Sequence, residues 1–358
     1  MNDDCLKLTT YFGERDRAGG AFVADALTEI YARHGLQISI VMRGVEGFGA
    51  KHLLRTDRLL SLSEDLPVVS VAVDSRSRIE AALREVEAVA FGGLVTLERA
   101  RMLWAPIDAV ELPADLHEAT KLTVYVGRHE RVGRAPAHEA LVALLHARGV
   151  AGATVLLGVD GTVGGERRRA RFFERNAGVP LMVVAIGEGA RIAAVLPELG
   201  ALLVRPLVTL ERVRVCKRDG ERLAEPRHVP ASDPSGLGLW QKLTVHAGEQ
   251  SRHHGHPLSG QLVRALRRSG AAGATSLRGI WGYHGDHPPH GDTLWQLRRR
   301  VPVVTVVVDT PPRIRELYAI VDELTDETGL VTSEIVPARR VGDPQHARGG
   351  LRPAARIR

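Results

Sequence analysis

The chain repeats one short phrase three times, and this repetition limits its fold more than any other feature. Each copy opens with Lys-Leu-Thr and closes with a phrase that ends in glutamate. The openings are Lys7-Leu8-Thr9, Lys121-Leu122-Thr123 and Lys242-Leu243-Thr244, and the closings are Leu94-Val95-Thr96-Leu97-Glu98, Leu207-Val208-Thr209-Leu210-Glu211 and Leu330-Val331-Thr332-Ser333-Glu334. The repeated unit is too long for a solenoid repeat and long enough for a core of its own.

We therefore divide the 358 residues into three small domains. The expected units are unit 1 (1–104), unit 2 (120–217) and unit 3 (240–338). The segments 105–119 and 218–239 are rich in Pro, Gly or polar residues, which predicts linkers. The arginine-rich segment 339–358 is predicted to be a disordered tail.

Each unit shows the same predicted order of elements. In unit 1, residues 6–12 alternate apolar and polar side chains, as a half-buried strand does. A helical stripe at 22–31 ends at Gly35, and apolar strands follow at 38–42 and 68–73. A second helix around 79–86 precedes a last strand at 94–97. This strand–helix–strand–strand–helix–strand order predicts an α+β class with three ferredoxin-like units.

A single unit of this kind would leave one face of its sheet uncovered. Val71 and Val73 belong to a strand whose two faces are both apolar, so the free face needs burial. Three linked units can cover these faces by packing around one axis. We therefore expect a monomeric, intramolecular pseudo-trimer with sheets inward and helices outward.

The composition indicates which partners the protein can bind and in which cellular compartment it resides. The net charge is +6, and the arginine runs 167–169 and 298–300 either attract phosphates or acidic partners or are solvated loops. Because they lack interleaved aromatic residues, we expect no nucleic-acid partner. Two cysteines, Cys5 and Cys216, do not make a disulfide framework, no apolar run reaches membrane-span length, and the acidic start does not resemble a signal peptide. These features favour the cytoplasm.

Glycines and arginines recur at matched positions near the long loop of each unit. Such glycines allow close approach of a backbone to an anion, and arginines would add charge; the alternative is a tight exit from a strand. The candidate ligand-binding residues are Arg17, Arg131 and Arg252 after the first strand, Arg43 and Arg278 before the loop, and Gly44, Gly47, Gly49, Gly158, Gly161, Gly279 and Gly282 within it. In unit 2, Leu157 replaces the arginine before the loop.

Lys7, Lys121 and Lys242 also occupy one matched position in a chain with few lysines. One interpretation is contact with a ligand. The other, which we favour, is a pair with Glu98, Glu211 and Glu334 on the neighbouring last strand.

The third long loop is rich in histidine. His284, His287 and His290 could hold a transition metal, although their spacing matches no strong zinc signature. The chain has no nucleophile elbow, Walker-type loop or His-Glu-x-x-His motif, so we do not expect an enzyme.

The motifs of unit 1 carry a resemblance to a known family. The stretches 6–17, 43–50 (Arg-Gly-Val-Glu-Gly-Phe-Gly-Ala) and 62–69 resemble the domain-of-unknown-function 190 family, whose members are similar to PII signalling proteins. Unit 3 keeps Arg278-Gly279-Ile280-Trp281-Gly282-Tyr283, and unit 2 keeps only the glycines of this pattern.

This resemblance implies a regulatory protein. PII-like trimers bind adenine nucleotides between subunits, so ATP, ADP or AMP would bind in clefts between the units. Their long T-loops contact a partner, which would be a membrane transporter or channel; members are often encoded beside fluoride exporters. The T-loops here are 44–65, 158–178 and 279–300. Gly92-Gly93 stands where PII proteins have a glycine–lysine phosphate loop, and unit 2 has Arg205-Pro206 there. The alternative function is divalent or transition metal binding or tolerance through the histidine-rich third loop.

Overall fold

The computed structural model describes residues 2–49, 52–56, 65–89, 91–104, 106–107, 109–169, 178–284, 288–291, 301–341 and 350–353. His287 and part of each T-loop lie outside the described residues. Unit 1 consists of β1 (Asn2–Gly13), β2 (Arg17–Ala18), β3 (Ala21–Phe22), α1 (Val23–Arg33), β4 (Ile38–Arg43), β5 (Glu46–Phe48), β6 (Arg55–Thr56), β7 (Pro67–Ser75), α2 (Arg76–Ala88) and β8 (Gly93–Trp104).

A short helix, η1 (Ala114–Leu116), connects units 1 and 2, and units 2 and 3 repeat the order of unit 1. Unit 2 consists of β9 (Thr120–Gly127), β10 (Arg131–Val132), β11 (Ala135–Pro136), α3 (Ala137–Ala147), β12 (Gly152–Leu157), β13 (Asp160–Val163), β14 (Glu166–Arg167), β15 (Pro180–Gly187), α4 (Gly189–Leu202) and β16 (Leu207–Arg212). Strand β17 (Arg214–Arg218) follows and ends where the predicted linker 218–239 begins. Strand β18 (Glu221–Arg222) lies within that linker. Unit 3 consists of β19 (Leu239–Gly248), β20 (Arg252–His253), β21 (His256–Pro257), α5 (Leu258–Arg268), β22 (Ala274–His284), β23 (His290–Gly291), β24 (Pro302–Asp309), α6 (Pro311–Leu324) and β25 (Leu330–Val341).

Within each unit the first long strand lies between the strand that follows the T-loop and the last strand. Strand β1 pairs with β7 and β8, β9 with β15 and β16, and β19 with β24 and β25, always antiparallel. Local sequence explains helix α1. Leu27, Ile30 and Tyr31 form its buried stripe, and Gly35, with φ of 59°, ends it.

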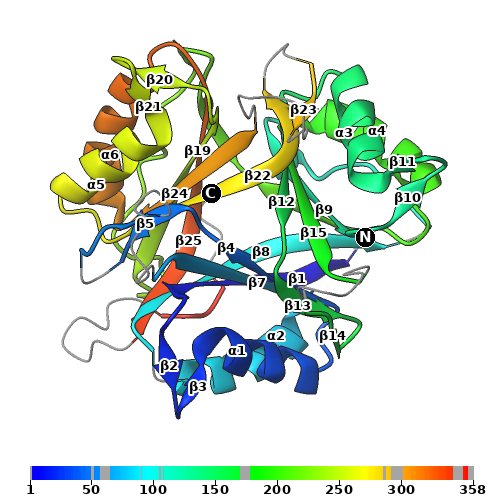
Figure 1. The fold of residues 1–358 in the computed structure, drawn as a ribbon, viewed down its shortest axis with the longest axis horizontal. Coiled ribbons are helices and arrows are strands. Elements are labelled where there is room, and N and C mark those ends of the chain that lie inside the picture. Colours follow the sequence, from blue (N-terminus) through cyan, green and yellow to red (C-terminus); the bar gives the residue numbers. More distant parts are fainter. Residues whose placement is uncertain are drawn as a thin grey trace.

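Apart from the hairpins β2–β3, β10–β11 and β20–β21, the strands of the three units join into one antiparallel sheet (Figure 1). Strand β8 pairs with β16, β12 with β22, and β25 with β8. A closed circuit therefore runs β8–β16–β9–β15–β12–β22–β24–β19–β25 and returns to β8. Strands β1, β7 and β4 extend the sheet from β8.

The expected fold class, three ferredoxin-like α+β units packed as a pseudo-trimer, was therefore wrong. The described residues form a closed antiparallel barrel of nine strands with six helices, because strands continue past their own unit and pair with the next one. The last strand of unit 3 also reaches Val341, so Arg339, Arg340 and Val341 belong to β25 and not to a disordered tail.

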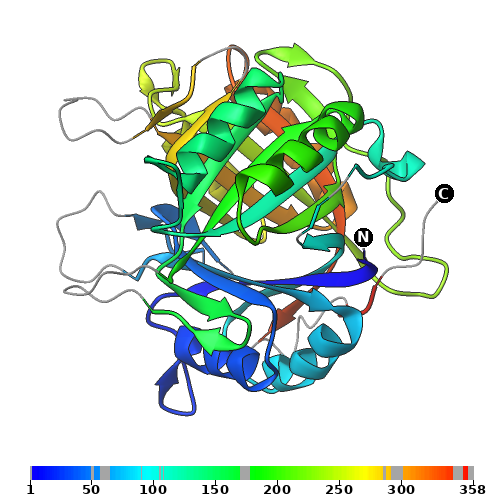
Figure 2. The ribbon, with the colours of Figure 1, turned by 90° about the vertical axis from the view of Figure 1, so that its right-hand side faces the viewer.

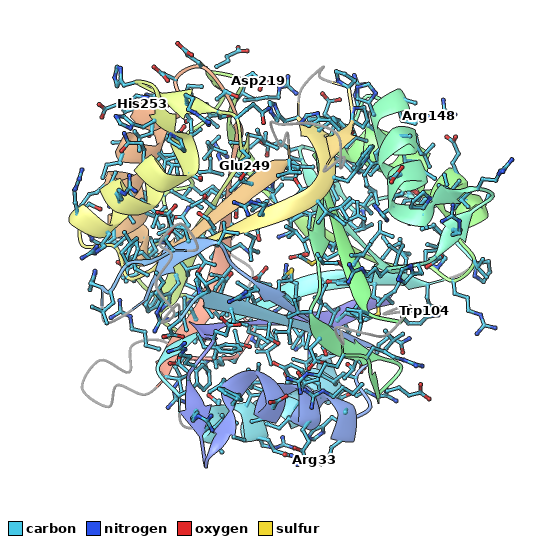
Figure 3. All side chains as sticks on the ribbon, in the orientation of Figure 1. Arg33, Trp104, Arg148, Asp219, Glu249 and His253 are labelled. Atoms are coloured by element: carbon cyan, nitrogen blue, oxygen red, sulfur yellow. The ribbon has the colours of Figure 1, made fainter. Side chains whose placement is uncertain are left out.

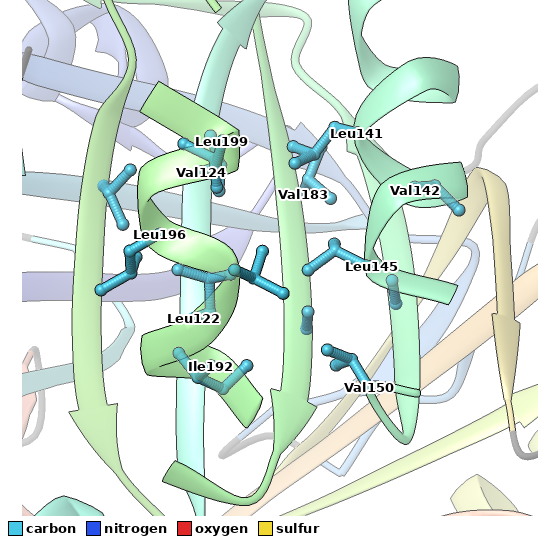
Figure 4. Packing of buried hydrophobic residues seen from close by; sticks show 14 of the residues in the cluster. Leu122, Val124, Leu141, Val142, Leu145, Val150, Val183, Ile192, Leu196 and Leu199 are labelled. Atoms are coloured by element: carbon cyan, nitrogen blue, oxygen red, sulfur yellow. The ribbon is translucent and has the colours of Figure 1, made fainter. Parts of the chain in front are cut away.

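Buried apolar side chains form one cluster beneath each pair of helices and one at the centre. Figure 4 shows the unit 2 cluster, where Leu141 and Leu145 of α3 and Leu196 and Leu199 of α4 pack on Val183 of β15. Figure 2 shows these helices on the outer face of their strands. The central cluster takes residues from all three units, including Val71, Leu156, Met182, Leu277 and Val304. Among the described helices, none combines the length and apolar character that crossing a membrane requires.

Candidate functional site

The lysines and glutamates of the repeated phrase meet in one buried cluster. We call Lys7, Lys121, Lys242, Glu98, Glu211 and Glu334 the lysine–glutamate ring. Within each unit the lysine faces its glutamate across the first and last strands, at Lys7↔Glu98, Lys121↔Glu211 and Lys242↔Glu334. The corresponding Nζ–Oε separations are 2.8, 3.0 and 2.7 Å. The predicted lysine–glutamate pairs are confirmed.

Each lysine also contacts a glutamate of another unit. Lys121 Nζ donates to Glu334 at 2.6 Å, and Lys242 Nζ donates to Glu98 at 2.8 Å. Lys7 Nζ donates to Glu211 and completes the cycle. The ring therefore alternates positive and negative groups around the centre and links all three units.

The charges of the ring stabilise one another against the cost of burial. Burial alone lowers the pKa of Lys7, but Glu211, Glu98 and Glu334 outweigh it and raise that pKa well above its usual value. For Glu98, burial raises the pKa, yet Lys242, Lys7 and Lys121 bring it well below the usual range. Burial dominates at Lys121 and lowers its pKa despite Glu211 and Glu334.

The three glutamates of the ring lie close together because the lysines hold them there. Oxygens of Glu98, Glu211 and Glu334 lie within 4.8 Å of one another, the geometry of a group that could hold a metal ion. Lysine ammonium groups already contact all three carboxylates. The site is thus built to hold ammonium groups, which act as internal counter-ions.

The predicted glycines lie where a strand of another unit crosses. A Cβ atom on Gly47 would come 2.5 Å from the Ala274 carbonyl oxygen, and one on Gly161 would come 2.2 Å from that of Ser39. At Gly282 the contact would be 2.2 Å from the Ala153 oxygen. At these glycines the group that approaches is protein backbone of another unit, and the binding of an anion there stays a prediction.

Their neighbours Gly44, Gly158 and Gly279 serve the same crossings. A Cβ atom on Gly44 or Gly279 would lie 3.0 Å from a carbonyl oxygen of another unit, and one on Gly158 would lie 2.9 Å from Ile40. Gly49 differs because nothing lies within 4 Å of its Cβ position, which leaves its backbone open.

The arginines after the first strand bond to their own hairpins. Arg17 donates to the Gly20 carbonyl at 2.8 Å and covers the Phe22 ring, Arg131 donates to the Arg134 carbonyl, and Arg252 donates to the Glu249 carbonyl at 2.8 Å. The structure does not bring them together with the loop glycines.

Arg43 and Arg278 each pair with a glutamate that follows the first strand. Arg43 contacts Glu14 at 2.9 Å, and Arg278 contacts Glu249 at 2.9 Å; Glu249 is labelled in Figure 3. These matched ion pairs join the ends of the first and second strands in units 1 and 3.

The described histidines of the third loop do not gather into a metal site. His284 ends β22, 4.0 Å from Asp219, whereas His290 begins β23 and its Nδ1 contacts the Pro288 carbonyl at 2.9 Å. The third predicted ligand, His287, lies outside the described residues. Within the described part of the chain, the group that meets metal-ligand geometry is the glutamate triad.

A cleft lies between unit 1 and unit 3, and it contains about 630 Å³ of space that is partly open to solvent. Figure 1 shows β5, at the base of the first T-loop, beside β22 of unit 3, with which it pairs. Two cations face the cleft: Arg55 of β6 and Arg340 of β25. Its lining also includes Tyr11, Phe48, Gly49, Gly92, Gly93, Gly273, Thr275, Val306 and Val308.

Both arginines are held at the cleft by neighbouring side chains. Arg55 forms an ion pair with Asp65 at 2.6 Å, and its guanidinium lies against Gly13. Arg340 lies 5.9 Å from the centre of the Trp240 ring and is opposite Leu94 in the β25–β8 pairing. Gly92 has open space around its Cβ position.

Sequence reasoning proposed only Gly49 among these cleft residues. Arg340 was assigned to the tail because its segment is rich in arginine and glycine. Arg55 was not singled out, although the same spacing places Arg169 of the arginine run 167–169 at the corresponding position of unit 2. The sequence feature that could have indicated the cleft is Gly92-Gly93, which stands before the last strand, where PII proteins have a phosphate loop.

Comparison with known families matches each repeated unit. The family model of DUF190, described as "Uncharacterized ACR", matches residues 5–102, 119–215 and 240–338, which together make up most of the chain. The chain belongs to the DUF190 family. Each matched segment contributes one lysine and one glutamate to the ring, and Arg340 lies just beyond the third DUF190 segment.

Among solved structures, the chain matches "Crystal Structure of Aspartate Kinase from Synechocystis" with 11% identity and a TM-score of 0.26. The match covers 97% of this chain and 46% of that one, so the DUF190 protein spans about half the length of the kinase structure. This similarity is too low to bear on fold or function.

Proposed function

We propose that the protein is a PII-like regulatory protein that binds a small anionic ligand, an adenine nucleotide in the first instance, in the cleft between units 1 and 3. One observation carries the proposal: Arg55 and Arg340, from opposite ends of the chain, face the same cleft at the base of a T-loop. Phosphate groups favour such paired arginines. The open backbone at Gly92 and the aromatic rings of Phe48 and Tyr11 suit a phosphate and a base, respectively.

In this proposal the first T-loop changes its contacts when a ligand binds in the cleft. Strand β6 carries Arg55 and pairs with β5, so a ligand that draws Arg55 from Asp65 changes the contacts at the base of the loop. The loop would then contact a partner, for which a membrane transporter or channel, including a fluoride exporter, is the candidate. The protein acts by binding and not by catalysis.

Calorimetric titration of the full chain with ATP, ADP and AMP tests the ligand site. Arg340→Ala is expected to weaken nucleotide binding about tenfold or more, because it removes a charge-assisted contact. Arg339→Ala is the matched control, since Arg339 pairs with Glu87 at 2.8 Å and does not line the cleft. Asp65→Asn should tighten binding by releasing Arg55. Absence of binding by all three nucleotides, or equal losses in Arg340→Ala and Arg339→Ala, would contradict the proposal.

A further inference from the structure

A second cavity lies at the centre of the molecule and differs in chemistry from the cleft. It contains about 680 Å³ of space, partly open, and takes its walls from all three units. We call it the axial cavity. Lys7, Lys121, Lys242 and Glu334 form its charged end.

Matched residues line the axial cavity in successive layers. Side chains two residues apart on a strand share one face, so the layer after the lysines is Thr9, Thr123 and Thr244. The next layer is Tyr11, Tyr125 and His246. Apolar side chains of the second and third strands make up the rest of the wall, including Leu156, Leu277 and Val304.

One wall of the cavity carries a hydroxyl that can bond to a ligand. Tyr125 is 5% exposed, and its hydroxyl has the Thr209 side chain as a neighbouring hydrogen-bond partner. A phenol hydroxyl both donates and accepts, so one protein partner leaves this group able to form a further hydrogen bond inside the cavity.

The charged end selects against ions. Three lysines and Glu334 line this end, but each ammonium group already contacts at least two glutamates of the ring. An anion would have to compete with these carboxylates for the lysines, and a metal ion would have to displace the ammonium groups. The walls favour an apolar body.

We propose that the axial cavity binds a neutral small molecule with an apolar body and one hydroxyl or carbonyl group, which bonds to Tyr125. The site is distinct from the cleft, although Tyr11 and Val306 line both. Those two side chains form a shared wall through which occupancy of one site can affect the other.

Titration of the full chain with 2-naphthol, and separately with 2-naphthoate, tests this site. We expect 2-naphthol to bind at one molecule per chain and 2-naphthoate to bind at least tenfold more weakly, because it carries a charge. Tyr125→Phe keeps the ring and removes the hydroxyl, and it should weaken 2-naphthol binding about threefold to tenfold. Tyr283→Phe is the control, since its hydroxyl donates to the Val150 carbonyl at 2.8 Å and does not line the cavity.

Three results would overturn the proposal. These are no binding of 2-naphthol at one per chain, equal effects of Tyr125→Phe and Tyr283→Phe, and loss of binding in Arg340→Ala but not in Tyr125→Phe. The last would place the probe in the cleft. Because nucleotides and 2-naphthol are titrated separately, failure at one site is distinguishable from failure at the other.

Discussion

At the scale of single residues, a lysine is required at three matched positions because its compact ammonium group bridges glutamates of two units. A guanidinium is larger and planar, and its fixed fork of donors suits one carboxylate better than two from different units. The sequence predicted the pairing within a unit from the repeated phrase alone. It could not predict the contacts between units, since these depend on how the first strands converge at the centre.

Lys121→Met should destabilise the protein by about 3–5 kcal/mol, because it leaves Glu211 and Glu334 with fewer cationic partners in a buried site. Lys121→Arg keeps the charge but replaces the compact ammonium group with a larger planar one, so we expect a smaller loss of about 1–3 kcal/mol. Urea unfolding measures both. Arg148→Met, which breaks an exposed pair with Glu198 of 2.6 Å, should leave the urea midpoint almost unchanged. A loss for Lys121→Met no larger than this control would refute the role of the ring.

His246 makes stability sensitive to mild acid. Burial, and then Lys121, lower the pKa of His246 to about 4, while Glu334 opposes them. Since the unfolded histidine titrates near pH 6.5, the unfolded chain binds the proton more readily, and stability present above about pH 6.5 is lost as the pH falls toward 4. His246→Tyr restores the residue type of Tyr11 and Tyr125 and should recover about 1–3 kcal/mol of this loss.

Urea unfolding of wild type and His246→Tyr at pH 7 and pH 4.5 measures the effect. The comparison stops at pH 4.5 because Glu98 and Glu334, whose pKa values are lowered in the fold, lose stability in both proteins at more acidic pH. An equal loss in the two proteins between pH 7 and 4.5 would show that His246 is not the group that titrates.

At the scale of elements, the loop glycines show what a sequence can and cannot indicate. Their recurrence indicated either a close approach of the backbone to an anion or a tight exit from a strand. The group that approaches Gly161 is the Ser39 backbone on β4, more than a hundred residues earlier, and no local pattern encodes that crossing. The fold class was wrong for the same reason. The sequence indicates the order of elements and the hydrophobic periodicity within a unit, but it does not indicate which strands pair between units.

Gly161→Ala should cost about 1–3 kcal/mol or more, because its Cβ would lie 2.2 Å from the Ser39 carbonyl oxygen and backbone cannot move aside easily. Gly49→Ala is the control, since it has open space and should change stability by no more than about 0.5 kcal/mol. Thermal unfolding compares the two. Equal melting temperatures would mean that β13 does not need its close contact with β4.

At the scale of the whole molecule, the units share the structures that stabilise them. The central apolar cluster and the lysine–glutamate ring each take side chains from all three units, and the barrel closes only when the three sets of strands pair. An isolated unit would expose part of the cluster and leave buried charges without partners. The three repeats are therefore expected to unfold together, although each has its own core beneath its helices.

Differential scanning calorimetry tests this cooperativity. We expect one transition whose calorimetric and van't Hoff enthalpies agree, in a protein that light scattering shows to be a single chain. Lys121→Met should lower the temperature of that transition without splitting it, because removing one charge of the ring weakens every junction that the ring joins. Three separate transitions, or a transition in which unit 2 alone melts early in Lys121→Met, would show that the units are stabilised independently. The ring would then not couple their unfolding.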